Sequence, residues 1–195
     1  MDSNNLDVLI TDYISSDIGE DDNQFYSSKL AILDTIGCII EASNHENVLQ
    51  FASKNNLSLN FKNPFKNLSL NESYENISWY LTVLTRWFDY NDTFLAKEWA
   101  HPSDNFGAIY SYFYKNKNYK FNDFTNALTK AYEIQGSLCL GTSLNKLGYD
   151  HVFYVKLASG SVFSDLVNNG DSNACLLYTS PSPRDAHESR MPSSA

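Results

Sequence analysis

The chain has 195 residues, 43% of them hydrophobic, which is enough for one domain with a substantial core. Its formal net charge is −9 at pH 7 and its basic residues form no cluster, which argues against nucleic-acid binding. No apolar run approaches the ~18 residues of a membrane span. Residues 1–34 carry eight acidic side chains and one basic one, unlike a typical mitochondrial transit peptide, so we expect a cytoplasmic protein without a membrane partner.

Apolar residues recur at helical spacing along most of the chain, which predicts a mainly α-helical fold. The expected helices cover residues 5–15, 25–43, 46–55, 74–88, 104–115, 122–140 and 150–167. The second helix is predicted to be long and buried, with its core-facing side formed by Leu30, Leu33, Ile36, Gly37 and Ile40. Asp34 lies in the same run, and we interpret it as a buried carboxylate with hydrogen-bond partners in the core.

Local signals add detail at several element boundaries. Ser103, Asn122 and Asp150 are candidate N-caps, because their side chains can accept hydrogen bonds from the first N–H groups of a helix. Residues 57–70 alternate polar and apolar side chains around Pro64, which predicts a small hairpin or an extended loop. The sequence shows no βαβ pattern and no glycine-rich loop suited to a phosphate group.

The last stretch of the chain differs from the rest. From about Leu176 it reads LLYTSPSPRDAHESRMPSSA, which has no periodicity and holds three of the five prolines. Such a composition cannot form a packed element, and it resembles a translated sequencing adapter or similar non-native scar. We therefore expect a folded part over residues 1–175 and a disordered part over 176–195. The alternative is a natural disordered tail.

The three cysteines are far apart and form no CxxC pair. Cys38 and Cys139 lie in apolar helical runs, so we expect both to be reduced thiols in the core. We predict no metal site and no cofactor.

Two histidines, His101 and His151, lie in polar settings outside the periodic runs, where a pair of imidazoles could supply an acid and a base. Aromatic residues flank the segment before His101, and aromatic walls exclude water from a pocket. The polar members of this segment are Asp89, Asn91, Asp92, Thr93, Lys97 and Glu98. By themselves they fit an active site and a helix end capped by Asp89, with solvated charges beyond it, equally well.

Four stretches carry a more specific signal. They read LAILDTIGCIIEA (30–42), RWFDYNDTFLAKEWAHPSDNFGAI (86–109), KAYEIQGSLCL (130–140) and LNKLGYDHVFYVKLAS (144–159). In this order they resemble the MmgE/PrpD family, which holds 2-methylcitrate dehydratase and cis-aconitate decarboxylase. The resemblance covers most of residues 25–165 and fades across 44–72. The spacing of WAHPSDN after FDYNDT favours the dehydratase branch.

The resemblance implies a large all-α domain followed by a smaller α+β domain. Residues 1–175 would then be the first part of the N-terminal helical domain, and the smaller α+β domain would be missing. It also implies a hydro-lyase that dehydrates 2-methylcitrate to 2-methyl-cis-aconitate in the methylcitrate cycle of propionate catabolism. The implied partner is a small-molecule tricarboxylate, and the full-length protein would be a homodimer.

The family pattern implies pocket roles for Asp89, Thr93, His101 and His151. Such a dehydration needs a base that takes a proton beside a carboxylate and an acid that protonates the departing hydroxyl. We predict that the two histidines lie nearest these proton transfers, that Asp89 orients or charge-balances one of them, and that Thr93 hydrogen-bonds the substrate. Further predicted substrate-binding residues are Asp92 and Ser103.

The sequence leaves open which histidine is the acid and which is the base. Two alternative functions also stay open. One is a cis-aconitate decarboxylase-like relative acting on a related acid. The other is a truncated, catalytically inactive helical fragment that lacks the substrate-binding lysines of the full-length family member.

Overall fold

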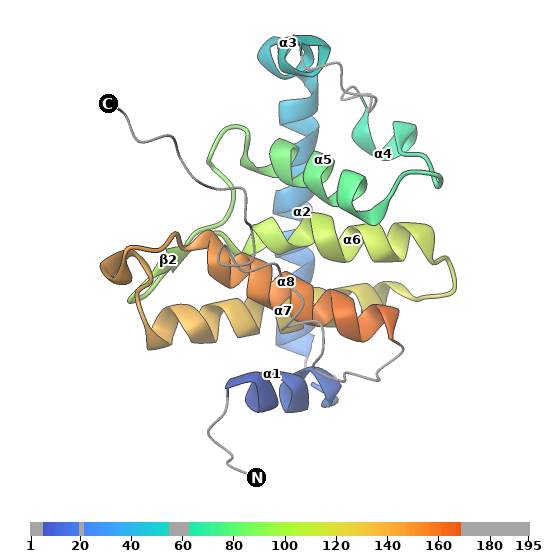
Figure 1. The fold of residues 1–195 in the computed structure, drawn as a ribbon. Coiled ribbons are helices and arrows are strands. Elements are labelled where there is room, and N and C mark those ends of the chain that lie inside the picture. Colours follow the sequence, from blue (N-terminus) through green and yellow to red (C-terminus); the bar gives the residue numbers. More distant parts are fainter. Residues whose placement is uncertain (1–5, 20–21, 55–62, 169–195) are drawn as a thin grey trace, which may run out of the picture.

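The computed structural model of the chain describes residues 6–19, 22–54 and 63–168. Within these residues the fold is built almost entirely from helices, as the sequence predicts (Figure 1). The described α-helices are α1 (Leu6–Ser15), α2 (Asp22–Asn44), α3 (Glu46–Lys54), α4 (Pro64–Asn67), α5 (Tyr74–Arg86), α6 (Phe106–Lys115), α7 (Phe121–Gly141) and α8 (Val152–Val167). Two 3-10 helices, η1 (Pro102–Asn105) and η2 (Asn145–Leu147), and two strands, β1 (Phe94–Leu95) and β2 (Trp99–Ala100), complete them.

Helix α2 crosses the other long helices (Figure 1). It runs from the bottom to the top of that view, with α1 near its lower end and α3 at its upper end, while α5, α6, α7 and α8 run across it. Its side contacts α5 and α7, and α6 in turn contacts α5, α7 and α8. The core therefore lies where these helices meet.

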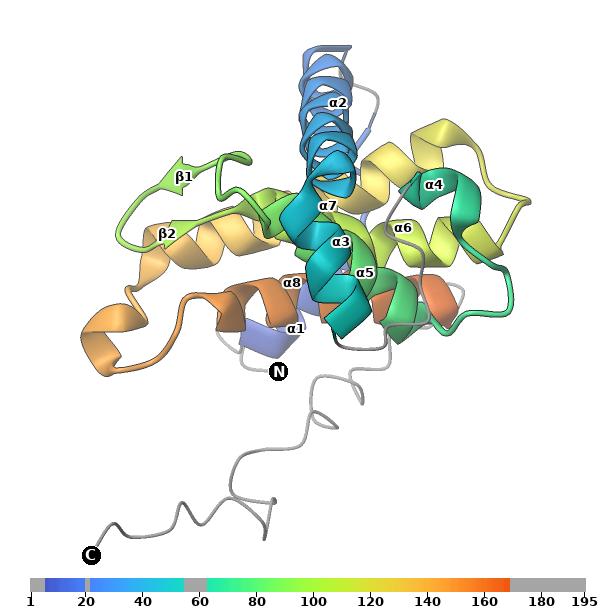
Figure 2. The same ribbon diagram turned by 90° about the horizontal axis from the view of Figure 1, so that it is seen from above.

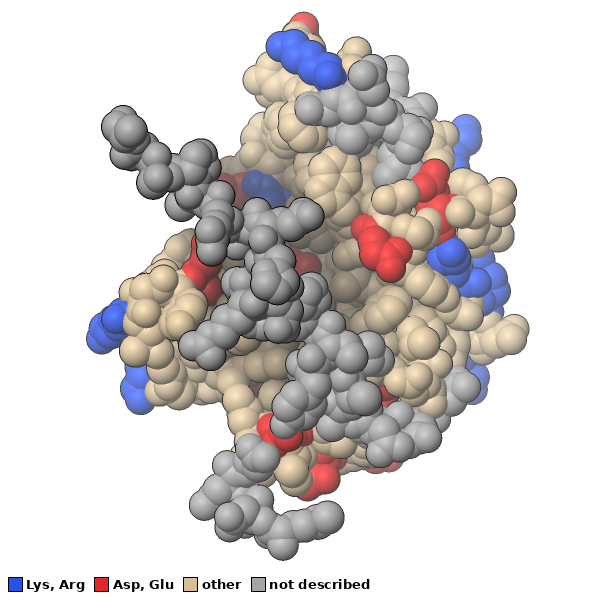
Figure 3. Space-filling view, in the orientation of Figure 1, with Lys and Arg blue, Asp and Glu red and all other residues tan. Residues whose placement is uncertain are grey.

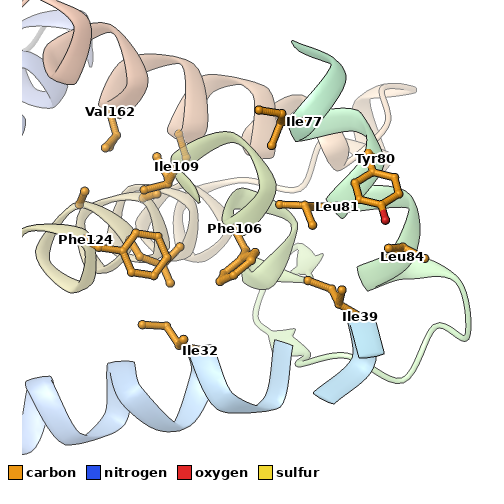
Figure 4. Packing of buried hydrophobic residues seen from close by; sticks show 14 of the residues in the cluster. Ile32, Ile39, Ile77, Tyr80, Leu81, Leu84, Phe106, Ile109, Phe124 and Val162 are labelled. Atoms are coloured by element: carbon orange, nitrogen blue, oxygen red, sulfur yellow. The ribbon is translucent and has the colours of Figure 1, made fainter. Parts of the chain in front are cut away.

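Phe106, the first residue of α6, lies at the centre of this core (Figure 4). Its ring lies between Ile32 and Ile39 of α2 on one side and Leu81 of α5 on the other, and it meets the ring of Phe124 edge to face. Each fully buried side chain of this kind stabilises the fold by about 1.5–3 kcal/mol. The start of α6 is thus fixed by packing on three helices.

Gly107 lets α6 approach α5 closely. A Cβ atom at this position would lie 2.6 Å from the carbonyl oxygen of Ser78 and 2.7 Å from Oγ1 of Thr82, both in α5. Real Cβ contacts of this length do not occur, so only glycine fits without a shift of one helix. The distance between α5 and α6 therefore depends on this residue.

The predicted core-facing side of α2 is wrong for most of its residues. Ile36 packs against the core as predicted, but the structure buries Ile32, Cys38 and Ile39, whereas Leu33 is 66% exposed and Asp34 is also exposed rather than buried. Both sides of α2 are apolar at helical spacing, so periodicity alone could not distinguish them. The expectation that Cys38 and Cys139 are buried thiols is confirmed.

Two local predictions also need correction. Of the predicted hairpin at 57–70, residues 57–62 lie outside the described residues, and Pro64–Asn67 forms the short helix α4. Proline favours the first position of a helix, and Asn63 before it adopts a left-handed conformation (φ 55°) that asparagine tolerates. Ser103 is not an N-cap either, because it lies inside η1, one turn before α6 begins.

The other two predicted N-caps are Asn122 and Asp150. Asn122 is not the cap of α7, since the helix begins at Phe121 and the side chain of Asp123 accepts a hydrogen bond from the Lys120 N–H instead (2.7 Å). Asp150 is not the N-cap of α8, because His151 occupies that position, but its Oδ1 accepts a hydrogen bond from the N–H of Val152, the first residue of the helix, at 3.0 Å.

The hairpin of β1 and β2 was not foreseen in the sequence. The strands are antiparallel, with Phe94 opposite Ala100 and Leu95 opposite Trp99. Ala100 is fully buried in a small cluster with Cys139 and Tyr154, so the hairpin rests on the end of α7 and the start of α8. Figures 1 and 2 both show it on the same side of the molecule as the connection between these helices.

The surface of the described residues shows no concentrated basic area on the face drawn in Figure 3, where lysine and arginine side chains stand apart near its edges. None of the helices in the described part of the chain is both long and apolar enough for a transmembrane segment.

The close contact at Gly107 predicts that Gly107→Ala lowers the free energy of unfolding by about 1–3 kcal/mol, because the methyl group must displace α5 from α6. Thermal and urea unfolding measure this change. Gly160→Ala in α8 is the matched control, since a Cβ there meets no atom within 4 Å and alanine should be neutral or stabilise the helix by up to about 1 kcal/mol. Equal effects of the two substitutions would contradict the packing account.

Candidate functional site

The segment between α5 and α6 begins with an unusual backbone conformation. Asp89 has a φ of 58°, and its N–H donates a hydrogen bond to the carbonyl oxygen of Arg86 at 3.1 Å. Aspartate is among the few residues that visit this left-handed region routinely. The turn reverses the chain after α5, and it leaves the Asp89 carboxylate 69% exposed and 2.7 Å from Nη2 of Arg86.

Buried polar contacts hold the two ends of this segment together. Nδ2 of Asn91 donates to Oγ of Ser103 at 2.7 Å, and Oδ1 of Asn91 accepts from Nη1 of Arg86 at 3.3 Å. Oδ1 of Asp92 accepts from the Ser103 N–H at 3.0 Å. These bonds join the connection before β1 to η1 after β2, so the hairpin and its flanking residues form one unit.

The His101 ring is buried in this unit, and its surroundings fix its tautomer. Its Nδ1 lies 2.6 Å from the carbonyl oxygen of Asp92. A carbonyl oxygen can only accept, so Nδ1 carries the proton and Nε2 of the neutral ring carries the lone pair. This Nε2 lies 3.7 Å from Oδ1 of Asp89, where a proton gained by the ring would meet a negative charge.

His151 lies beside a carboxylate at the start of α8. Its Nδ1 is 3.1 Å from Oδ1 of Asp150, and because a carboxylate oxygen can only accept, this contact favours the tautomer with the proton on Nδ1. Its Nε2 is buried and has no hydrogen-bond partner among the described residues. Burial lowers the pKa of His151 below its ordinary value, and the nearby Asp150 and Glu98 carboxylates only partly oppose this.

Trp99 brings the two histidines together. The centroid of its ring lies 3.8 Å from that of His151 and 5.5 Å from that of His101. His101 meets the indole edge to face, at an interplanar angle of 87°. Two imidazoles from segments fifty residues apart in sequence therefore share one aromatic wall, and each has an Nε2 lone pair that no described residue engages by a hydrogen bond.

Arg86 is shared between an exposed and a buried carboxylate. Besides its contact with Asp89, its Nε lies 3.6 Å from Oδ1 of Asp104, which is buried in η1. Burial raises the pKa of Asp104 to about 6, against the opposing effects of Arg86 and His101. Next to it, Nδ2 of Asn105 donates to Oε1 of Gln135 at 2.6 Å, which anchors η1 to α7.

The structure thus gathers most of the predicted site residues in one place. His101, Asp89 and Asp92 lie in direct contact, and His151 joins them through Trp99. Thr93 is exposed beside them on the connection to β1. Ser103 is fully buried, and both its N–H and its hydroxyl are engaged within the chain, so its predicted substrate contact would require Asn91 to give way.

Two acidic residues of this site received no role from the sequence. Asp104 stands in the HPSDN motif three residues after His101, and Glu98 stands in the polar segment before it. Both are buried in the structure. Nothing in a single sequence distinguishes a buried carboxylate from a solvated one, so only their nearness to His101 could have drawn attention to them. Within the described residues, no three His, Cys, Asp or Glu side chains are grouped as metal ligands would be.

The fold is that of a helical domain in which two imidazoles share one aromatic wall, and comparison with known proteins identifies the class of protein to which it belongs. The family model described as the MmgE/PrpD N-terminal domain matches residues 10–174. The mitochondrial 2-methylcitrate dehydratase of Yarrowia lipolytica is 30% identical over 170 residues, which make up 81% of this chain and 33% of that protein.

Two shorter matches agree with this one. The probable 2-methylcitrate dehydratase of Saccharomyces cerevisiae is 41% identical over 97 residues, 44% of this chain and 19% of that protein. The 2-methylcitrate dehydratase of Escherichia coli is 39% identical over 94 residues, 44% of this chain and 20% of that protein. The chain therefore spans a third or less of the length of these relatives. It belongs to the MmgE/PrpD family, and the match lies in the N-terminal domain of that family.

The burial of Asp104 predicts a specific pH dependence of stability. A carboxyl whose pKa rises from 3.8 unfolded to about 6 folded favours folding only while it is protonated, and this contribution is lost as the pH rises from about 4 to 6. Asp104→Asn should therefore raise the free energy of unfolding at pH 7 by up to about 3 kcal/mol, and by little at pH 4. Urea unfolding at the two pH values measures this difference.

Asp89→Asn is the matched control, because it removes the exposed carboxylate on the same arginine. It should change the free energy of unfolding by less than about 1 kcal/mol at either pH. Destabilisation by Asp104→Asn of the same size at pH 4 and pH 7 would contradict the assignment of Asp104 as a buried group with a raised pKa.

Proposed function

We propose that this domain forms one wall of the active site of a 2-methylcitrate dehydratase, a hydro-lyase that removes water from 2-methylcitrate to give 2-methyl-cis-aconitate. Family membership supports a lyase of this kind, and the curated relatives carry that name. The observation that carries the proposal is the pair of buried imidazoles beside Trp99. Nδ1 of His101 is hydrogen-bonded to the carbonyl oxygen of Asp92, Nδ1 of His151 lies beside the Asp150 carboxylate, and neither Nε2 has a hydrogen-bond partner among the described residues. A dehydration needs two such groups, one to take a proton and one to deliver a proton.

His151 is the better base of the two. Its lowered pKa keeps it neutral at physiological pH, and its unpartnered Nε2 lone pair can take a proton from carbon. The Asp150 carboxylate, 3.1 Å from Nδ1, would then stabilise the imidazolium that forms, because a nearby negative charge favours the charged ring. The proton to be removed is on a substrate carbon next to a carboxylate, so it is weakly acidic. A base from whose surroundings water is partly excluded helps to remove it, because electrostatic interactions are stronger there than in water.

His101 is then the acid. When its Nε2 is protonated, that proton lies between the ring and the Asp89 carboxylate at the open side of the site. From there it can pass to a hydroxyl group, which leaves as water rather than as hydroxide. Thr93 is exposed and directly follows Asp92, whose backbone carbonyl oxygen contacts this histidine, so we propose that the Thr93 hydroxyl contacts the hydroxyl or a carboxylate of the substrate and that the Asp92 carboxylate contacts the substrate hydroxyl.

The charges of this wall indicate that other residues must complete the site. Asp89, Asp92 and Asp150 lie next to the two histidines, whereas Arg86 is already shared between the carboxylates of Asp89 and Asp104. A tricarboxylate substrate carries about three negative charges at neutral pH, and it would be repelled by an acidic wall alone. We infer that the cationic groups come from parts of the full-length protein beyond this chain. This chain on its own is then a catalytically inactive fragment.

The kinetic test uses a full-length protein that carries this domain. His101→Gln and His151→Gln should each lower kcat for 2-methylcitrate about 10²- to 10⁴-fold, as expected for loss of a general acid or base. The appearance of the conjugated product is followed by its ultraviolet absorbance. His45→Gln is the matched control, since this histidine packs edge to face on Phe88, away from Trp99, and should keep near-normal activity.

Two results would separate the alternatives. Normal dehydration by both histidine variants would remove the proposed mechanism. Release of carbon dioxide from an unsaturated tricarboxylate, with no dehydration of 2-methylcitrate, would favour a decarboxylase of the same family.

A further inference from the structure

We propose that Glu98 is a positioning residue for His151. Its buried carboxylate accepts hydrogen bonds that join the connection between α7 and α8 to the β1–β2 hairpin, and these bonds place the imidazole of His151 against Trp99. The positioning can be tested without catalysis, whereas its importance for turnover rests on the proposed function of His151 as the base.

Both carboxylate oxygens of Glu98 are engaged. Oε2 accepts hydrogen bonds from the Asn145 N–H at 2.8 Å and from the Ser143 hydroxyl at 3.1 Å. Oε1 accepts from Nδ2 of Asn145 at 2.8 Å and from the N–H of Trp99 at 3.2 Å. The Glu98 N–H itself donates to the carbonyl oxygen of Cys139 in α7 at 3.0 Å.

Such an arrangement is unusual for a side chain that is only 2% exposed. Among the described residues no lysine or arginine pairs with Glu98 within 4 Å, so its charge is balanced by these hydrogen-bond donors. The donors lower the pKa of Glu98 below its usual range, with the Asn145 N–H as the largest contributor, so it is ionised at neutral pH. Hydrogen bonds to an ionised acceptor are about twice as strong as neutral ones.

The connection that Glu98 holds has few other anchors. Most of its residues are exposed, including Leu147 at 61% and Tyr149 at 66%, and Gly148 lies in a left-handed turn (φ 81°). A second tie is the hydrogen bond from the Tyr154 hydroxyl to the carbonyl oxygen of Thr142 at 3.1 Å. Little apolar burial fixes the loop, so its path depends on the bonds to Glu98.

The position of Glu98 in the sequence links the loop to the site. It directly precedes Trp99, whose ring contacts both His101 and His151. Glu98 is therefore adjacent in the chain to the aromatic side chain of the site and is hydrogen-bonded to the loop that precedes His151. When the hydrogen bonds from the loop to Glu98 are lost, His151 can move away from Trp99. His101 keeps its position, because its Nδ1 is hydrogen-bonded to the carbonyl oxygen of Asp92 within the hairpin unit.

The first part of the experiment uses this chain and the ring-current effect of Trp99 on His151. The His151 ring lies 3.8 Å from the Trp99 ring, centroid to centroid, at an interplanar angle of 37°. The indole ring current therefore shifts the His151 protons in the NMR spectrum, and loss of this contact removes the shift. Glu98→Gln keeps the size of the side chain but places an NH₂ group against donors. We expect it to remove most of the shift of His151 and to leave that of His101 unchanged. Glu133→Gln is the control, since Glu133 accepts a hydrogen bond from Tyr13 elsewhere on α7.

A milder substitution covers the case in which Glu98→Gln does not fold. Asn145→Ala removes only the side-chain donor at 2.8 Å and leaves the backbone bond to Glu98 in place. It should reduce the His151 shift partly. A full His151 shift in a folded Glu98→Gln chain, or in Asn145→Ala when Glu98→Gln does not fold, would overturn the proposal.

The second part measures turnover in the full-length enzyme. A base displaced by about 1 Å can cost on the order of 100-fold in rate. Glu98→Gln should therefore lower kcat about 10- to 100-fold and change KM little, because Glu98 is buried away from the substrate. Loss of the His151 shift together with normal turnover would leave the positioning role standing and would refute His151 as the base. Normal stacking with reduced turnover would refute the positioning role.

Discussion

The contact of α6 with α5 at Gly107 is the constraint on which the site depends. Arg86 ends α5, and η1 with Asp104 leads directly into α6, so the crossing of these helices sets the distance from the arginine to the buried carboxylate. Phe106 fixes the same end of α6 in the core. The residues between α5 and α6 must then span a short gap, and they do so as a hairpin that carries Trp99 and His101 outward over α7.

A second feature is that several buried polar side chains hydrogen-bond to one another. Asn91, Asp92 and Ser103 bond to one another across the ends of the hairpin segment, and Glu98 satisfies donors of a neighbouring loop. Buried polar groups with such partners specify one arrangement, because any other would leave a donor or acceptor unpaired. These ordered surroundings also fix the positions of the two histidine rings. His101 is hydrogen-bonded through Nδ1 and His151 has the Asp150 carboxylate beside its Nδ1, which leaves Nε2 of each ring for chemistry.

The sequence predicts the helices well and their orientation poorly. Long apolar periodicity located α5, α7 and α8 within a few residues, but α2 is apolar on both sides and the wrong side was chosen for the core. The family resemblance implied that Asp89 would lie beside one of the two histidines, and its carboxylate is 3.7 Å from Nε2 of His101. Neither the two-residue strands nor the burial of Glu98 and Asp104 could be predicted, because they follow from contacts with α7 and the loop after it. Such contacts join residues about forty positions apart and leave no periodic pattern.

The central claim is that both imidazoles are fixed with the proton on Nδ1 and a lone pair on Nε2. Long-range ¹H–¹⁵N NMR correlations of the histidine rings in this chain report the tautomer of each ring directly, when they are recorded at a pH high enough for both rings to be neutral. We predict the Nδ1–H form for His101, set by the carbonyl oxygen of Asp92, and for His151, set by Asp150. The Nε2–H form at either histidine would contradict the account, because that ring could not act as proposed.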